Sequence, residues 1–351
     1  MAVLAVVPLA GQTKYNVPRM PDGHPDLQGT YDLATMTPLE RLPGDPPFYT
    51  KEKAEQLQKA ELARRAKTNL PSAANRPAPP VGGDRTPPRS FFEILEKAGG
   101  GAVGGYNTFW LHQGTDFTIV DGQVRTSIVV DPPDGHVPAY NAAARQRLAA
   151  ARATPTSDAR GESQDPTAEP PGAFDNPEQR PLGERCLLGF SSTSGPPALP
   201  DYFYNDLHQI VQTPNSIMIL TEMVHDARII RMNAQHVPKA IRRWMGDSVG
   251  HWEGDTLVVD TTNFNDKTRF RNATENLHVI ERFTRIGDKT LLYRFTIEDP
   301  QTWDRAWTGE YTWPATDKPI YEYACHEGNY ALGDVMRGAR HQEAEEAKTG
   351  K

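Results

Sequence analysis

Residues 207–232 read LHQIVQTPNSIMILTEMVHDARIIRM and contain the clearest strand pattern of the chain. Leu207–Thr213 and Ser216–Met223 are rich in β-branched residues, and the Thr-Pro-Asn-Ser sequence between them suits a type I turn. A corner at His225-Asp226 then leads into a third predicted strand, Ala227–Met232. The pattern predicts a series of antiparallel strands joined by short connections.

Side chains alternate between the two faces of a strand, so the pairing register decides which residues share a face. Pairing Gln212 with Ile217 places four residues on one face: His208, Ile210, Ile219 and Thr221. The other face is mostly apolar but includes Gln209 and Glu222.

A second hairpin is predicted from 277–286 and 290–298. The loop between them places Phe283 opposite Tyr293 and gathers the large apolar residues on one face. Glu281 lies on the same face. A carboxylate in that position must be functional, protonated or paired, and a salt bridge to a neighbouring arginine is the structural alternative.

The chain from residue 207 onward contains about eight or nine predicted strands, and the last two are 307–313 and 320–325. A meander of this kind removes its exposed edges by closing into a barrel. The predicted fold class is therefore mainly β: an antiparallel meander barrel, lipocalin-like, wrapped by N-terminal helices and long loops. A barrel of about eight strands has room for one small ligand.

A chain of 351 residues can bury a sizeable core as one domain. Residues 13–338 are predicted to form a single β-rich domain, in which 13–183 wraps the main strands of 184–330. Residues 339–351 are predicted to be a charged tail. Helices are predicted at Lys51–Lys67, Ser90–Ala98, Ala139–Arg152 and Pro238–Gly246.

Residues 1–12 include the run AVLAVVPLA, whose length matches the apolar part of a secretory signal, with a disordered N-terminus as the alternative. The expected location is periplasmic or secreted. The chain has two cysteines, Cys186 and Cys325. They would form a disulfide in an exported protein and remain buried thiols in a cytosolic one. Because they flank the regular β region, we expect their Cα atoms to lie within about 7 Å.

Charge and motifs exclude several classes of function. A net charge of −7 without a basic stripe argues against nucleic acid, and no apolar run approaches the roughly 20 residues of a membrane span. No P-loop, HExxH or nucleophile elbow is present, so no cofactor and no metal site are predicted. A weaker alternative is a metal site formed by His208, His225 and His326. The predicted partner is a small-molecule ligand or substrate.

Ionisable residues gather where the predicted strands end, which suits proton transfer, although an ion-paired corner is the structural alternative. The predicted catalytic residues are Glu222, His225, Asp226, Arg228, Glu281, His326 and Glu327. The predicted substrate-binding residues are aromatic or polar, and they are Tyr106, Asn107, Trp110, His208, Gln209, Tyr293 and Trp252.

The runs RCLLGF, EMVHDARII, GHWEGDTLVVDTTNF and CHEGNY form a longer pattern. It resembles a family of uncharacterised exported bacterial proteins over nearly the whole chain, which implies export but no particular activity. The first predicted function is an exported enzyme that applies general acid–base chemistry in a barrel pocket. Its substrate would be a small polar or amphipathic molecule, such as a sugar or a hydroxylated cyclic compound, and it would be a lyase, isomerase or hydrolase. The alternative is a lipocalin-like binding protein for an apolar small molecule.

Overall fold

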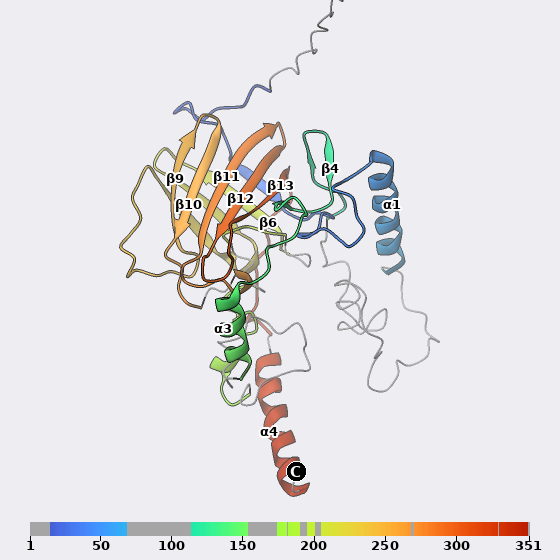
Figure 1. Cartoon of the computed structure of the whole chain (residues 1–351), viewed down its shortest axis with the longest axis vertical. Helices are drawn as coiled ribbons and strands as arrows, with labels where there is room; N and C mark the ends of the chain where they lie inside the picture. The colour runs from blue at the N-terminus through green and yellow to red at the C-terminus, as the bar shows by residue number, and fades with distance from the viewer. Residues whose placement is uncertain are drawn as a thin grey trace, which may run out of the picture.

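A computed structural model describes residues 15–68, 114–153, 174–180, 182–189, 195–200, 205–267, 270–328 and 330–349 (Figure 1). Within these residues the protein is mainly β, as the sequence predicts. A closed barrel of nine strands forms its centre, and one further strand extends the same sheet beyond the closure.

The barrel strands are β1 (Gly29–Asp32), β6 (Leu207–Gln212), β7 (Ser216–Thr221), β8 (Ala227–Met232), β9 (Asp247–Glu253), β10 (Thr256–Thr262), β11 (His278–Gly287), β12 (Thr290–Glu298) and β13 (Trp307–Thr316). Neighbouring strands are antiparallel except for β8 and β9, which are parallel. The barrel is therefore mixed, and the purely antiparallel meander expected from the sequence is corrected at this pair. A parallel pair needs a long crossover, and residues 233–246 supply it through turns where the sequence predicted a helix.

The two predicted hairpin registers are confirmed. Gln212 lies opposite Ile217 in the β6–β7 pair, and Phe283 lies opposite Tyr293 in the β11–β12 pair. A shift of one residue would have moved each apolar set to the outside of the barrel, so the hydrophobic pattern specifies the register strongly.

The barrel closes through β1, which pairs with β6 on one side and with β13 on the other. The sequence predicted a strand at 320–325 next to the first central strand, but these residues form an irregular segment after β13. The closing strand comes from the N-terminal part of the chain.

Large aromatic side chains fill the inside of the barrel. Trp307, Trp313, Tyr293, Tyr311 and Phe295 are 0% exposed. The Tyr293 ring contacts three of the others, and its centroid lies 4.6 Å from that of Trp313. The barrel is a packed core where these residues meet, because no surface of these side chains is left for a solvent molecule to touch.

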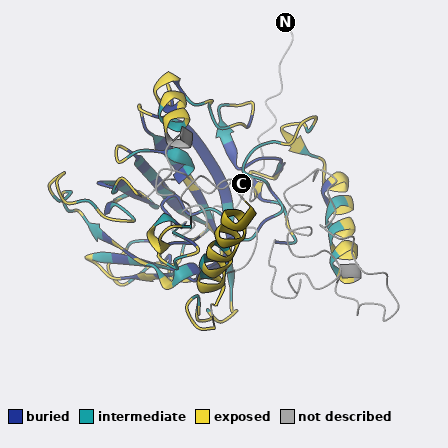
Figure 2. Cartoon of the chain, turned by 90° about the horizontal axis from the view of Figure 1, so that it is seen from below, coloured by how far each residue is buried: buried dark blue, intermediate teal, exposed yellow. Residues whose placement is uncertain are grey.

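Shorter elements surround the barrel. Strands β2 (Phe48–Tyr49), β3 (Ile119–Val120) and β4 (Gln123–Arg125) form a small separate sheet, while β5 (Val129–Asp131) pairs with β13. The helices are α1 (Lys51–Thr68), α3 (Ala142–Ala153) and α4 (Ala331–Thr349), with 3-10 turns at Pro177–Gln179, Met223–His225 and Phe270–Asn272. Figure 2 shows that the barrel strands are largely buried and that α4 is exposed along its length. The helix predicted at 90–98 lies outside the described residues.

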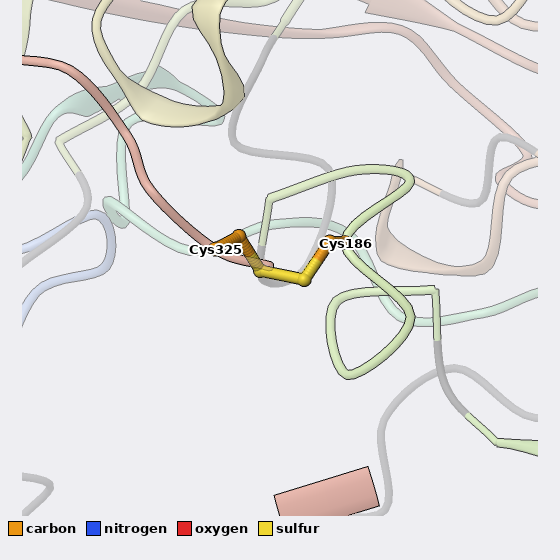
Figure 3. Close-up of a disulfide and its surroundings, with 2 residues drawn as sticks. All are labelled: Cys186 and Cys325. Carbon is orange, nitrogen blue, oxygen red and sulfur yellow. A yellow bond between two sulfur atoms is a disulfide. The ribbon is translucent and has the colours of Figure 1, made fainter. Parts of the chain in front are cut away.

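The predicted disulfide is confirmed. Cys186 and Cys325 are bonded, with their Cα atoms 5.8 Å apart (Figure 3). The bond joins the segment that precedes the central strands to the segment that follows β13. Among the described residues, no helix is long and apolar enough to cross a membrane.

Candidate functional site

The corner after β7 is the first predicted cluster. The Glu222 carboxylate accepts hydrogen bonds from the backbone N–H groups of Leu207 at 3.3 Å and Tyr321 at 2.8 Å. His225 Nε2 accepts one from the backbone N–H of Tyr323. Val224 has a φ of 65°, an unusual value for a β-branched residue. The Glu222 and His225 side chains thus fasten residues 321–323 to the corner.

The other predicted acids and bases lie in different places, and Asp226 continues the corner, where its backbone oxygen accepts from the N–H of Thr221 at 2.8 Å. Asp226 is half-buried at the start of β8, and His326 and Glu327 are exposed on the segment before α4. Arg228 is buried and points into the barrel instead. The structure therefore separates Arg228 from the Glu222 and His225 side chains, whose hydrogen bonds go to the backbone.

Arg228 and Glu281 form a bidentate ion pair inside the barrel. The Arg228 Nη2 group donates to Glu281 Oε1 at 2.8 Å, and its Nη1 group donates to Oε2. The Tyr293 hydroxyl donates to the same Oε1 at 2.9 Å. Burial lowers the pKa of Arg228, but the neighbouring Glu281 carboxylate raises it by more, so the guanidinium stays charged. This outcome is the salt bridge that the sequence offered as the structural alternative for Glu281.

His208 lies inside the barrel, with its ring centroid 5.5 Å from that of Trp313. Burial lowers the pKa of His208 to about 4, so the ring is neutral at physiological pH. Within the described part of the chain, the indole N–H of Trp313 has no hydrogen-bond partner, and a hydrogen bond to the backbone of Asp206 partly offsets the effect of burial on the His208 pKa. Such unsatisfied groups are rare in protein interiors.

The remaining predicted binding residues are scattered. Gln209 is half-buried on β6, opposite Leu220. Trp252 stacks on His24 at a ring distance of 4.9 Å. Tyr293 belongs to the ion pair inside the barrel, and Tyr106, Asn107 and Trp110 lie outside the described residues.

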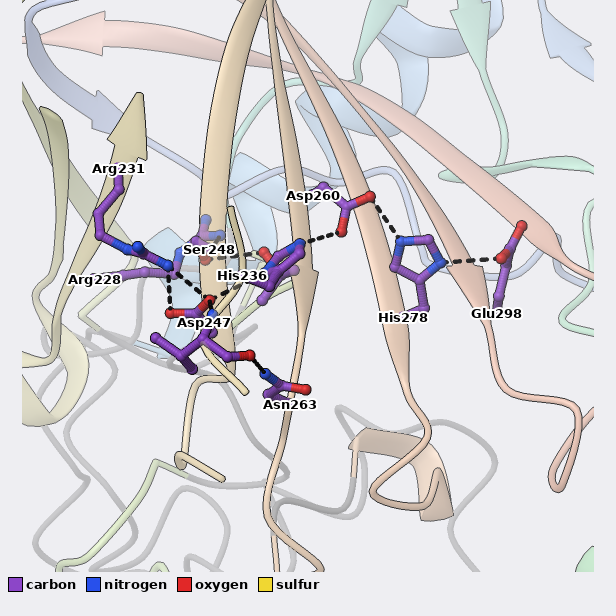
Figure 4. Close-up of polar contacts among 11 residues, drawn as sticks. Arg228, Arg231, His236, Asp247, Ser248, Asp260, Asn263, His278 and Glu298 are labelled. Atoms are coloured by element: carbon purple, nitrogen blue, oxygen red, sulfur yellow. Dashed lines mark hydrogen bonds and ion pairs between the residues drawn. The ribbon is translucent and has the colours of Figure 1, made fainter. Parts of the chain in front are cut away.

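The strongest cluster of ionisable residues lies on the outside of the barrel and was missed at the sequence level (Figure 4). It runs across β9, β10, β11 and β12 and alternates between carboxylates and imidazoles. We call it the outer row, and its members are Asp247, His236, Asp260, His278 and Glu298.

Each imidazole of the outer row contacts two carboxylates, one through each ring nitrogen. His236 lies 3.0 Å from Asp247 through Nδ1 and 3.0 Å from Asp260 through Nε2. His278 lies 3.0 Å from Asp260 through Nε2 and 3.1 Å from Glu298 through Nδ1. A ring that donates from both nitrogens is an imidazolium. The contacts of His278 therefore suit a protonated ring.

Asp247 anchors one end of the row and is 1% exposed. It accepts hydrogen bonds from Arg231 at 2.8 Å and from the backbone N–H of Val237 at 3.0 Å, in addition to His236. Burial raises the pKa of Asp247, but these hydrogen bonds outweigh that effect and leave the pKa below its usual value. Asp247 therefore fixes the crossover and the ring of His236.

His278 occupies the other, more open end of the row. Its pKa is raised, first by the hydrogen bond to the Asp260 carboxylate, against the opposing effect of burial. The side chain of His278 is 27% exposed and that of Glu298 is 45% exposed, so a solute can reach both. In such a pair, the charged imidazole can donate a proton and the accessible carboxylate can accept one.

Part of the outer row could have been found from the sequence. The register that places Phe283 opposite Tyr293 also places His278 opposite Glu298, as the structure shows. Asp260 on β10 lies diagonally from His278, and that relation needed the β10–β11 register. His236 lies on the irregular crossover, so no periodic pattern could have assigned it to the row.

The described residues contain no group of His, Cys, Asp and Glu side chains suited to holding a metal ion. The fold and the outer row define the protein as a closed mixed β-barrel with a carboxylate–imidazole chain on its surface. Comparison with known proteins found no matching family model, no matching curated protein and no matching solved structure.

Titration of His278 predicts a pH dependence of stability. Because its folded-state pKa lies above its usual value of 6.5, its stabilising effect is complete below about pH 6.5 and is lost as the pH rises through the folded pKa. Relative to His278→Gln, the wild-type free energy of unfolding should fall by up to about 1 kcal/mol between pH 6 and 9. Urea unfolding at several pH values measures this difference, and a difference independent of pH would contradict it.

Proposed function

We propose that the protein is an exported enzyme that applies general acid–base chemistry to a small polar molecule, and that the outer row is its active site. The observation that carries the proposal is His278, a half-exposed imidazole held between two carboxylates. In this proposal the chemistry lies outside the barrel, since the described aromatic residues fill its centre.

In this site His278 is the general acid and Glu298 is the general base. The two groups lie opposite each other on β11 and β12, so a substrate hydroxyl that inserts between them meets a proton donor and an acceptor together. Asp260 holds the ring of His278 from the other side and balances its charge. Many lyase, isomerase and hydrolase reactions on a sugar or a hydroxylated cyclic compound use such a pair.

The disulfide supports the exported part of the proposal. Disulfides persist in oxidising compartments such as the bacterial periplasm and the extracellular space, and they are rare in the cytosol. The localisation that we propose is therefore periplasmic or secreted.

The test is turnover of a panel of hexoses, uronic acids and hydroxylated cyclic acids in D2O, followed by proton NMR for lost C–H signals and new products. We expect turnover by the wild type and a rate lower by about 100-fold or more in His278→Gln. His251→Gln is the matched control, because His251 is also an exposed imidazole paired with a carboxylate on the outer surface. No turnover by the wild type, or equal rates in the two variants, would contradict the proposal.

A second candidate function is binding of a small, mainly apolar molecule inside the barrel. It is favoured by the unpartnered indole N–H of Trp313, which lies beside the neutral ring of His208 in an aromatic interior and which a ligand could satisfy after local opening. His208→Leu removes the polar ring that a ligand beside Trp313 would contact, so it should weaken saturable binding of the neutral dye Nile red. Absence of saturable binding by the wild type would rule this candidate out.

A further inference from the structure

The crossover between β8 and β9 differs in charge from the rest of the molecule. Residues 233–246 read NAQHVPKAIRRWMG and contain Lys239, Arg242 and Arg243 but no carboxylate, in a chain with a net charge of −7. Two large apolar side chains lie among these cations and reach the solvent: Ile241 is 47% exposed and Trp244 is 39% exposed.

The crossover is held firmly against the barrel although its tip is exposed. The backbone of Arg243 donates to Asn263 O at 2.9 Å and accepts from the N–H of Asn265 at 2.9 Å. The side chain of Asn263 donates to Val237 O at 2.9 Å. Since the backbone is already ordered, little conformational entropy remains to be lost when the tip contacts a partner.

The cations reach the solvent to different degrees, and the side chain of Arg242 is only 29% exposed. The side chain of Arg243 is 53% exposed even though it lies 3.4 Å from Asp247. Arg242 donates to the backbone oxygen of Glu275 at 2.7 Å and lies 3.8 Å from its carboxylate. Lys239 is exposed. The tip thus presents positive charge around two apolar side chains.

We propose that residues 239–244 bind the surface of an anionic lipid membrane. Tryptophan and aliphatic side chains partition into the boundary between head groups and acyl chains, while flanking lysine and arginine side chains contact anionic head groups. A soluble polyanion would attract the cations but would leave Ile241 in water. The pairing of exposed apolar groups with cations therefore favours a lipid surface over nucleic acid.

Binding of this kind is reversible and sensitive to salt. Each cation near an anionic surface contributes about 1 kcal/mol, and salt screens that contribution within a Debye length of about 10 Å at 0.1 M. Two partly inserted apolar side chains add to this but do not anchor the protein permanently.

The experiment uses the full chain with vesicles of phosphatidylcholine alone or with about one quarter phosphatidylglycerol, separated by flotation at low salt. We expect binding only to the phosphatidylglycerol vesicles, reduced about tenfold by Lys239→Glu and by the double change Ile241→Asn with Trp244→Ser. Ile286→Asn is the matched control, because Ile286 is 41% exposed at the β11–β12 turn. Circular dichroism confirms that each variant is folded.

Three results would overturn the proposal. One is equal binding to both kinds of vesicle, and another is equal loss in the crossover variants and in Ile286→Asn. The third is binding to heparin, a soluble polyanion, that exceeds vesicle binding and is unaffected by Ile241→Asn with Trp244→Ser, since that would identify a simple cationic surface.

Discussion

Replacing Glu281 with leucine is expected to lower the free energy of unfolding by about 3–5 kcal/mol. Glu281 is 0% exposed and is the partner of Arg228, so its loss leaves a guanidinium charge without a counterion inside an aromatic core. The Tyr293 hydroxyl also loses its acceptor. The loss in the free energy of unfolding comes mainly from the unpaired buried charge, since a buried ion pair adds little net stability compared with apolar groups of similar size.

A double-mutant cycle separates these contributions. Arg228→Met combined with Glu281→Leu removes both charges and should recover most of the stability lost in Glu281→Leu. Arg282→Met is the control, because Arg282 pairs with Glu253 on the outer surface and both side chains are more than 40% exposed. It should change stability by at most about 1 kcal/mol. Urea unfolding measures the wild type, Glu281→Leu, Arg228→Met, the double variant and Arg282→Met, and a loss below about 1 kcal/mol in Glu281→Leu would falsify the buried pair.

Removing the disulfide is expected to lower the free energy of unfolding by about 2–5 kcal/mol. Cys186 and Cys325 are 139 residues apart in the sequence, so the bond closes a long loop and restricts the unfolded chain strongly. Urea unfolding of the double variant Cys186→Ser with Cys325→Ser measures the effect.

Reduction supplies the control for this prediction. A reducing agent should lower the stability of the wild type to that of the double serine variant and should leave the variant unchanged. Equal stability of the wild type with and without the reducing agent would contradict a stabilising bond.

The central hairpins could be predicted from the sequence because their information is local. Alternating apolar residues and a short loop set the register of β11 and β12, and Phe283 does lie opposite Tyr293. The disulfide was predictable because Cys186 and Cys325 are the chain's two cysteines and flank the β region.

The features that the sequence did not reveal depend on contacts between distant segments. Gly29–Asp32 closes the barrel between β6 and β13, and nothing in its four residues specifies those partners. The parallel pairing of β8 and β9 likewise depends on how the crossover folds back.

The residues of the candidate site were also hard to predict, because contacts between distant segments bring them together. The sequence directed attention to Glu222, His225 and Arg228 because they are close together in the chain. The structure places the first two on a backbone-fixing corner and the third inside the barrel. The outer row draws its members from four strands and a loop, so only the three-dimensional registers bring His236 and His278 together at Asp260.

In the outer row, we expect His278 to be a charged imidazole between two carboxylates. The most direct measurement is the pH titration of its two ring nitrogens by 15N NMR, with the exposed His251 as the reference. We predict that His278 shows the doubly protonated signature at pH 6.5 and loses it only at higher pH, as its raised pKa requires. A neutral ring at pH 6.5, or a midpoint below that pH, would contradict the account.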